Sequence, residues 1–150
     1  MSMENPLKNG SLKEAVIKYV KKKYKSEIEY LWKSTPDAGI FRHADNQKWY
    51  GLVMEVSRDK FGLSEEGCVC ALNVKTDDPM LHDILIQQNG FFPGYHMNKK
   101  NWISILLDGT VPFDRICEMI DMSYQATAPK KRKAKVYSSQ GSSANRPARK

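Results

Sequence analysis

The sequence predicts an α+β domain of two layers, in which an antiparallel sheet carries helices on one face. The chain has 150 residues, of which 41% are hydrophobic, and this suffices for one core. Segments with the two-residue period of strands follow one another through short turns, so neighbouring strands should run antiparallel. Segments with helical period open the chain, precede the last strand and close the domain. The predicted order is therefore α-β-β-β-β-α-β-α.

The first helix is predicted from about residue 12 to residue 24. Ser11 and Glu14 have the spacing of a capping box at its start, and apolar side chains then recur at helical spacing. Its outer stripe consists of Lys18, Lys21, Lys22 and Lys25. We interpret this stripe as a solvated helix face. The alternative is that it contacts phosphates together with the C-terminal tail.

Four strands should follow this helix. They are predicted over residues 27–32, 39–43, 47–56 and 68–75. Turn-forming residues at Ala44, Asp45 and Asn46 join the second strand to the third, so these two strands should form a hairpin. The face of the sheet away from the helices should stay open, because no segment of the sequence supplies a second layer over it.

The fourth strand should have two different faces. We expect Cys68 and Cys70 beside Leu72 on a buried face, where cysteine acts as a small hydrophobic residue. Asn73 and Lys75 then project from the opposite, outward face. The three cysteines are an odd number, which fits a reducing compartment.

The second helix should begin at Asp78, whose carboxylate can cap the first turn, with Pro79 inside that turn. The later elements are a loop or short irregular strand over residues 91–100, a strand over 101–107, and a helix from Pro112 to about residue 124.

The predicted domain covers residues 11–128, between a flexible leader at 1–10 and a disordered basic tail at 129–150. The tail contains eight Lys and Arg residues, no acidic residue and no apolar periodicity, so it cannot offset its ordering entropy. Residues 1–128 contain sixteen Lys and Arg residues against all seventeen Asp and Glu residues, so the net charge of +7 comes from the tail. A near-neutral body limits non-specific affinity for nucleic acid, which depends on phosphate neutralisation.

Two segments combine cations, imidazoles and aromatic rings. One reads FRHADNQKWYG from Phe41, and the other reads PGYHMNKKNWISILLDG from Pro93. Together with LNVKTDDP from Leu72 and DMSY from Asp121, they resemble the MmcQ/YjbR family in order along the chain. The resemblance runs from about Ser11 to Tyr124.

The resemblance implies a small bacterial α+β domain with a CyaY-like fold and a DNA-binding role. Members are said to resemble double-wing DNA-binding domains. In this chain the wings would be the hairpin at 38–56 and the region before Trp102. Arg42, Lys48, Lys99 and Lys100 would lie on them.

Cations beside stackable rings suit an anionic ligand with flat groups, such as DNA or RNA. The candidate binding residues are Arg42, His43, Lys48, Trp49, Asn73, Lys75, Tyr95, His96, Asn98, Lys99, Lys100 and Trp102 in the domain, and Lys130, Lys131, Arg132 and Lys133 in the tail. The alternative is that the aromatic rings fill the core and the histidines hold loops in place. We expect Trp102 and His96 to be structural, and Lys99 and Lys100 to lie at the contact surface.

The leading hypothesis is a non-enzymatic domain that binds nucleic acid. The second is a module resembling secretion chaperones, which would bind a protein or peptide on the open sheet face. His43 and His96 could form an acid/base pair, but no nucleophile motif accompanies them. No catalytic residue, metal site or cofactor is predicted. The chain has no run of about 18 apolar residues and no apolar signal region, so we expect a cytoplasmic monomer without membrane contact.

Overall fold

A five-stranded antiparallel sheet in the order β1-β2-β3-β5-β4 forms the centre of the fold. The structure, a computed structural model, describes residues 11–129. The elements are α1 (Ser11–Tyr24), β1 (Gly39–Arg42), β2 (Trp49–Ser57), η1 (Arg58–Phe61), β3 (Cys68–Lys75), α2 (Pro79–Leu85), β4 (Phe91–Pro93), β5 (Trp102–Leu106) and α3 (Phe113–Thr127). The predicted leader at 1–10 and nearly all of the predicted tail, residues 130–150, lie outside the described residues.

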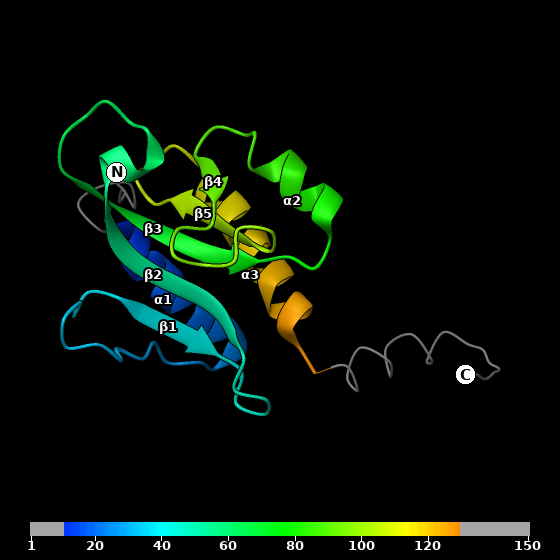
Figure 1. Cartoon of the computed structure of the whole chain (residues 1–150). Helices are drawn as coiled ribbons and strands as arrows, with labels where there is room; N and C mark the ends of the chain where they lie inside the picture. The colour runs from blue at the N-terminus through cyan, green and yellow to red at the C-terminus, as the bar shows by residue number, and fades with distance from the viewer. Residues whose placement is uncertain (1–10, 130–150) are drawn as a thin grey trace.

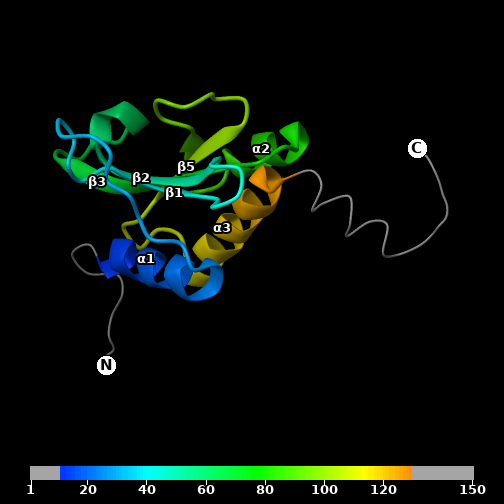
Figure 2. The ribbon, with the colours of Figure 1, turned by 90° about the horizontal axis from the view of Figure 1, so that it is seen from below.

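The layers follow the predicted α+β fold class. Helices α1 and α3 cover one face of the sheet, which we call the helix side (Figure 1). Figure 2 shows that the loop between β4 and β5, residues 94–101, stands over the other face. We call this other face the outer face. Helix α2 lies at the end of the sheet near β5. The loop therefore covers part of a face that the sequence predicted to be open.

The core lies between the sheet and the two long helices. Val16 and Val20 of α1 and Leu72 and Val74 of β3 belong to one core cluster, and all four are fully buried. Helix α3 adds Ile116, Met119 and Ile120 at helical spacing. Each such side chain contributes about 1.5–3 kcal/mol when it is fully removed from water.

The strand predicted at 27–32 is not formed. This segment makes a single bridge, in which Glu29 and Ile40 exchange two backbone hydrogen bonds of 2.9 Å. Strand β1 has only four residues, so it offers few ladder positions to a neighbour at its outer edge. Beyond Glu29, the residues Tyr30, Leu31 and Trp32 are exposed by 50%, 45% and 36%.

A β-bulge in β2 changes the direction of its first side chains. Phe41 pairs with Gly51, whereas the next residue, Arg42, pairs with Trp49, so Tyr50 is an extra residue. Tyr50 is fully buried on the helix side. Gly51 also faces this side, because a Cβ there would lie 2.9 Å from the ring of Phe41.

The prediction that Cys68 is buried is wrong, because it lies at the exposed first position of β3, opposite Ser57 at the end of β2. Cys70 is half-buried, and burial together with the nearby Glu55 carboxylate raises the pKa of its thiol to about 12. Cys117 in α3 is also half-buried, and burial raises its pKa to about 11.

Candidate functional site

The predicted site residues come from three places: the turn between β1 and β2, the end of β3, and the loop 94–101. The strand register shows which of their side chains share the outer face, because residues directly opposite each other project to the same face. Lys75 pairs with Trp102, and Asn73 pairs with Ser104 and with Leu52. These residues therefore lie on the outer face, under or beside the loop 94–101.

Gly94 fixes the start of the loop 94–101. A Cβ at Gly94 would lie 2.6 Å from the Cβ of Trp102, so only glycine permits this approach. The Gly94 N–H donates to the Trp102 carbonyl at 2.9 Å. The Lys99 ammonium donates to the Gly94 carbonyl at 2.9 Å and closes the loop. Asn98 accepts from the Lys100 and Trp102 backbone N–H groups, so much of the PGYHMNK segment maintains the shape of the loop.

Asn73 does not project into solvent as predicted. It is fully buried, and its side-chain oxygen accepts from the Ser104 hydroxyl. Ser104 in turn accepts from the Tyr95 backbone N–H at 2.9 Å. The loop is thus connected to the middle of the sheet through a buried polar chain, and Asn73 supports the site without being available to a ligand.

Trp102 is 9% exposed, as the structural interpretation of this residue predicted. His82 of α2, which sequence reasoning missed, is also buried, and its Nε2 donates to the Trp102 carbonyl at 3.1 Å. His96 was predicted to be structural, but it is exposed, with a φ of 62° and its ring 4.0 Å from the ring of Tyr95. Of the two histidines considered as a pair, His96 is therefore the one at the surface.

His43 is buried on the helix side and is not available to a ligand. Its Nε2 donates to the Thr127 hydroxyl at 2.8 Å, which in turn donates to the Ser123 carbonyl. Its ring packs against Tyr124 at 4.3 Å. Since His96 stands on the opposite side of the sheet, the fold does not assemble the two imidazoles into an acid/base pair.

Arg42 is half-buried and already engaged. Its Nε and Nη2 donate to the two carboxylate oxygens of Glu29 at 3.0 and 2.6 Å. This bidentate pair occupies the guanidinium edge that would otherwise bind a phosphate. The sequence did not reveal this pairing, because it depends on the bridge between Glu29 and Ile40.

The remaining candidates of the hairpin lie at the surface. Lys48 is exposed in the turn, and Trp49 is half-buried with its ring 5.7 Å from Trp32, at an interplanar angle of 79°. Within residues 11–129, no carboxylate forms an ion pair with Lys48, Lys75, Lys99 or Lys100. Lys75, the two loop lysines and the half-buried Trp49 are therefore the outer-face groups available to an anion, and Lys48 lies in the turn at the end of the hairpin.

The DMSY segment of α3 connects elements on the helix side. Asp121 accepts from the hydroxyls of Tyr19 and Tyr24 and from the Lys23 ammonium. Ser123 accepts from the Lys75 backbone N–H at 2.8 Å and donates to the Tyr50 carbonyl at 2.7 Å. This motif therefore has a structural explanation that requires no ligand.

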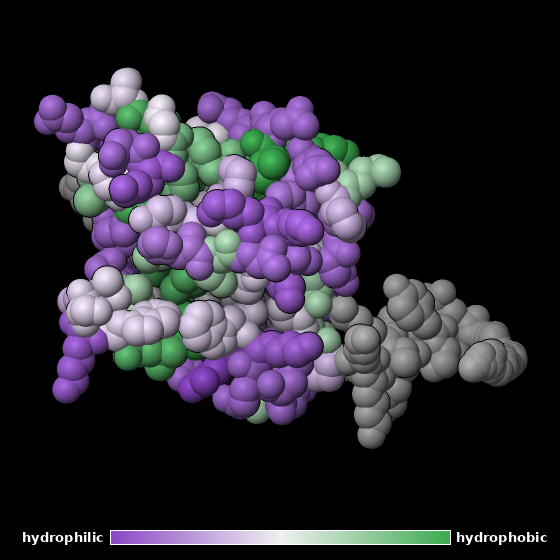
Figure 3. All heavy atoms as spheres, in the orientation of Figure 1, coloured by the Kyte–Doolittle hydropathy of each residue, from purple (hydrophilic) through white to green (hydrophobic). Residues whose placement is uncertain are grey.

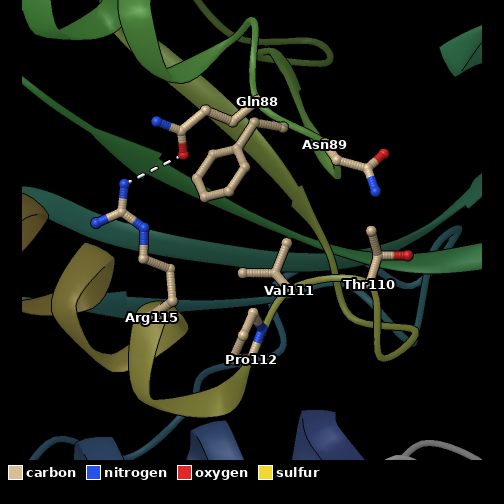
Figure 4. Close-up of a pocket in the computed structure, with 7 residues that line it drawn as sticks. Gln88, Asn89, Thr110, Val111, Pro112 and Arg115 are labelled. Atoms are coloured by element: carbon tan, nitrogen blue, oxygen red, sulfur yellow. Dashed lines mark hydrogen bonds between the residues drawn. The ribbon is translucent and has the colours of Figure 1, made fainter.

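A separate hollow lies between the end of α2 and the start of α3 (Figure 4). It has a volume of about 260 Å³, and Phe91, Val111 and Pro112 form much of its wall. Arg115 is the single cation among the seven lining residues, and it donates to Gln88 and Glu118 at 3.2 Å each. Because this guanidinium is already engaged, the hollow is a weaker anion site than the outer face.

Two further features of residues 11–129 concern metal sites and membrane-spanning helices. No cluster of three or more His, Cys, Asp or Glu side chains in this range has a geometry that could hold a metal ion. None of the helices in the same range has the length and apolar character needed to cross a membrane.

Comparisons with known proteins identify a family model, a relative and solved structures that are similar to this chain. The family model described as YjbR matches residues 21–126. The uncharacterized protein YyaQ of Bacillus subtilis is 40% identical over 115 residues, which cover 77% of this chain and 97% of YyaQ. A crystal structure of a Pseudomonas syringae protein is 36% identical with a TM-score of 0.74, covering 77% of this chain and 97% of its own. A Deinococcus radiodurans protein shares the fold, with a TM-score of 0.60 at 21% identity over 88% of this chain and 91% of its own.

Proposed function

This chain belongs to the YjbR family, and from the surface that its fold presents we propose that it is a non-enzymatic domain that binds nucleic acid. DNA is the first candidate. The binding surface comprises the turn 44–48, Lys75, the exposed part of the loop 94–101 and the basic C-terminal segment that begins at Lys130. Arg42, His43, Asn73 and Trp102 support this surface from within.

One observation carries the proposal. The half-buried Trp49 shares the outer face with Lys75, and lysines without carboxylate partners among residues 11–129 surround this face. Lys75 projects from β3, Lys100 lies in the loop above, and Lys48 is the exposed sequence neighbour of Trp49 in the turn at the end of the hairpin. Phosphates attract such lysines, and rings between them can contact bases.

The start of the basic segment supports the same surface. Asn46 in the turn 44–48 donates its side-chain amide to the Thr127 carbonyl at 3.0 Å, and His43 bonds the Thr127 hydroxyl. The described chain therefore ends at Pro129, close to this turn and to Lys48. Eight basic residues follow that point in the sequence, and we assign their charge to the same binding surface.

The absence of catalysis is part of the proposal. His43 is bonded to Thr127 in the helix-side core, whereas His96 lies on an exposed loop over the outer face. Proton transfer to a substrate requires groups within hydrogen-bond reach of one reacting centre. The separation of these two imidazoles supports a binding role.

Two matched double variants test this proposal in the full-length protein. Lys75→Ala with Lys100→Ala removes two charges from the outer face and the loop above it, and Lys18→Ala with Lys22→Ala removes two from exposed positions of α1 on the helix side. Fluorescence anisotropy with labelled DNA should show weaker binding for the first variant only. Its plot of log affinity against log salt should be shallower by about 0.9 for each duplex phosphate that is no longer neutralised. Equal affinities for both variants, or no salt-dependent binding by the parent, would contradict the proposal.

A second candidate function, protein recognition, is favoured by the exposed apolar side chains of Leu31, Met80 and Ile84. Exposed apolar side chains are found at protein interfaces. Met80 and Ile84 lie four residues apart on α2, whereas Leu31 belongs to the segment that bridges to β1 at the other side of the sheet. Co-purification of one protein partner that withstands moderate salt and is lost in Leu31→Ala would favour this function over nucleic-acid binding.

A further inference from the structure

The β-bulge in β2 decides which way Trp49 points. Leu52 lies on the outer face, since it pairs with Asn73 and with Ile40. In a regular strand, a residue three positions before Leu52 would project to the opposite face, which here is the helix-side core. The extra residue reverses this relation, because Arg42 and Ile40 share a face and Trp49 pairs with Arg42. The bulge thus moves a tryptophan ring from the core to the surface, and bulges often re-aim a side chain in this way.

The bulge requires particular neighbours. Gly51 leaves room for the ring of Phe41, and Tyr50 fills the core with its ring 6.1 Å from Phe41. Tyr50 already fills the core position, and Trp49 is half-buried beside Trp32, so part of the Trp49 ring stays accessible on the outer face. This accessible part can contact a ligand outside the domain.

A second tryptophan meets Trp49 on this side. Trp32 comes from the segment that was predicted to be a strand, and it is 36% exposed. The two rings form an edge-to-face pair, so they cover only one of their four ring faces by mutual contact. In Figure 3, a pale band of intermediate hydropathy crosses the lower half of the outer face, with strongly hydrophilic areas above it and below its right-hand end.

The charge around this pair is complementary to phosphate. Lys33 and Lys48 are exposed sequence neighbours of Trp32 and Trp49, and Lys75 projects from the same face as Trp49. The Glu29 carboxylate is neutralised by Arg42, the cross-strand partner of Trp49. An uncharged apolar partner would provide no opposite charge for these three lysines.

From these observations we propose that the ligand is single-stranded nucleic acid, and that Trp32 and Trp49 form a platform on which its bases stack. This inference rests on the proposed function and specifies its substrate. A duplex hides the faces of its bases inside the stack, whereas a single strand presents them to aromatic rings. Base stacking also supplies affinity that a nearly neutral body cannot obtain from phosphate contacts alone.

The test uses the full-length protein and two labelled probes: an oligothymidylate of about 20 nucleotides, longer than the roughly 4–16 nucleotides that one small domain covers, and a duplex of the same length. Anisotropy should show tighter binding of the single strand. Trp32→Ala should weaken that binding on the order of tenfold, and Trp32→Phe, which keeps a ring, should restore most of it. Intrinsic tryptophan fluorescence should be quenched when the single strand is added.

Leu31→Ala is the matched control, because Leu31 is the exposed apolar neighbour of Trp32 and has no aromatic face. It should bind the single strand as the parent does. Thermal unfolding checks that each variant is folded, and Trp49→Phe provides a second ring-conserving variant in case Trp49→Ala does not fold.

The outcomes separate the two proposals. Salt-dependent binding of the duplex at equal or higher affinity than the single strand would overturn the stacking inference and leave the proposed function standing. An unchanged affinity of Trp32→Ala for the single strand would also overturn the stacking inference alone. So would a loss of single-strand affinity in Leu31→Ala as large as that in Trp32→Ala, because it would indicate an apolar protein-binding surface. Failure of the parent to bind either probe at about 50 mM salt would overturn both proposals.

Discussion

Asp121 is a point where one carboxylate holds two elements together. Its partial burial alone would raise its pKa, but hydrogen bonds from Tyr24, Lys23 and Tyr19 outweigh this and hold the pKa below its usual value. A carboxylate with a lowered pKa stabilises the folded state above its unfolded pKa, and this contribution is lost as the pH falls through the folded pKa. Helix α1 is thus joined to α3 by an interaction that depends on pH.

Asp121→Asn should therefore lower the free energy of unfolding at pH 7 by about 1–2 kcal/mol. Urea denaturation at pH 7 and at about pH 3 measures this. The difference from the parent should shrink at the lower pH, because Asp121 is then increasingly protonated in the parent. Glu66→Gln, at an exposed loop position, should behave as the parent at both values. An equal loss for Asp121→Asn at both pH values would contradict this role of the charge.

The three thiols should differ in reactivity. Cys70, with its pKa raised to about 12 by burial, has about one thiolate in ten thousand molecules at pH 8. Cys117, whose pKa is also raised, should react slowly as well, whereas the exposed Cys68 should react at once. Ellman's reagent should titrate one thiol rapidly in the native protein and all three in denaturant. If the native Cys68→Ser variant still reacts rapidly with Ellman's reagent, Cys70 or Cys117 is more accessible than the structure indicates.

The loop 94–101 depends on one close backbone approach. Gly94→Ala would place a Cβ 2.6 Å from the Cβ of Trp102 and 3.0 Å from its backbone carbonyl. Overpacking of this kind costs about 1–3 kcal/mol, so the variant should melt at a lower temperature than the parent. Pro93→Ala changes the exposed neighbour and should have little effect. A parent-like melting temperature for Gly94→Ala would mean that the loop can shift without cost.

Local signals in the sequence were sufficient for several elements. Strand β3 has the predicted bounds, and the Asp78 carboxylate caps α2 by accepting from the Met80 and Leu81 N–H groups. Helix α3 begins after Pro112 as predicted and continues to Thr127. In each case the determinant lies within a few residues of the element, as with a capping carboxylate or an alternating apolar pattern.

The features that were not predicted depend on contacts between distant segments. The bulge in β2 requires Phe41 to lie over Gly51, and an alternating pattern alone does not reveal where an extra residue is inserted. Asn73 is buried because the loop 94–101 folds back over β3. The position of Trp32 beside Trp49 was not predicted. A strand was expected at 27–32, and in that interpretation Trp32 was one residue of a strand and not an exposed ring.

In the whole molecule, the net positive charge and the buried core belong to different parts of the sequence. Residues 11–129 contain the buried core and a near balance of acidic and basic residues, and the sequence after Pro129 is strongly basic. Stability and electrostatic attraction should therefore respond to different changes. The attraction should come largely from the segment that starts beside the turn 44–48.

A chain that ends at Pro129 tests this separation. It should keep the melting temperature of the full chain, because the removed sequence has no apolar periodicity. Its affinity for single-stranded nucleic acid should fall, and the slope of log affinity against log salt should decrease by about 0.7 for each phosphate that the basic segment would otherwise neutralise. Replacing Lys130, Lys131, Arg132 and Lys133 by alanine should reproduce part of this change, whereas replacing Ser138, Ser139, Ser142 and Ser143 by alanine should not. If the shortened chain keeps both affinity and slope, the outer face alone carries binding, and the basic segment has another role.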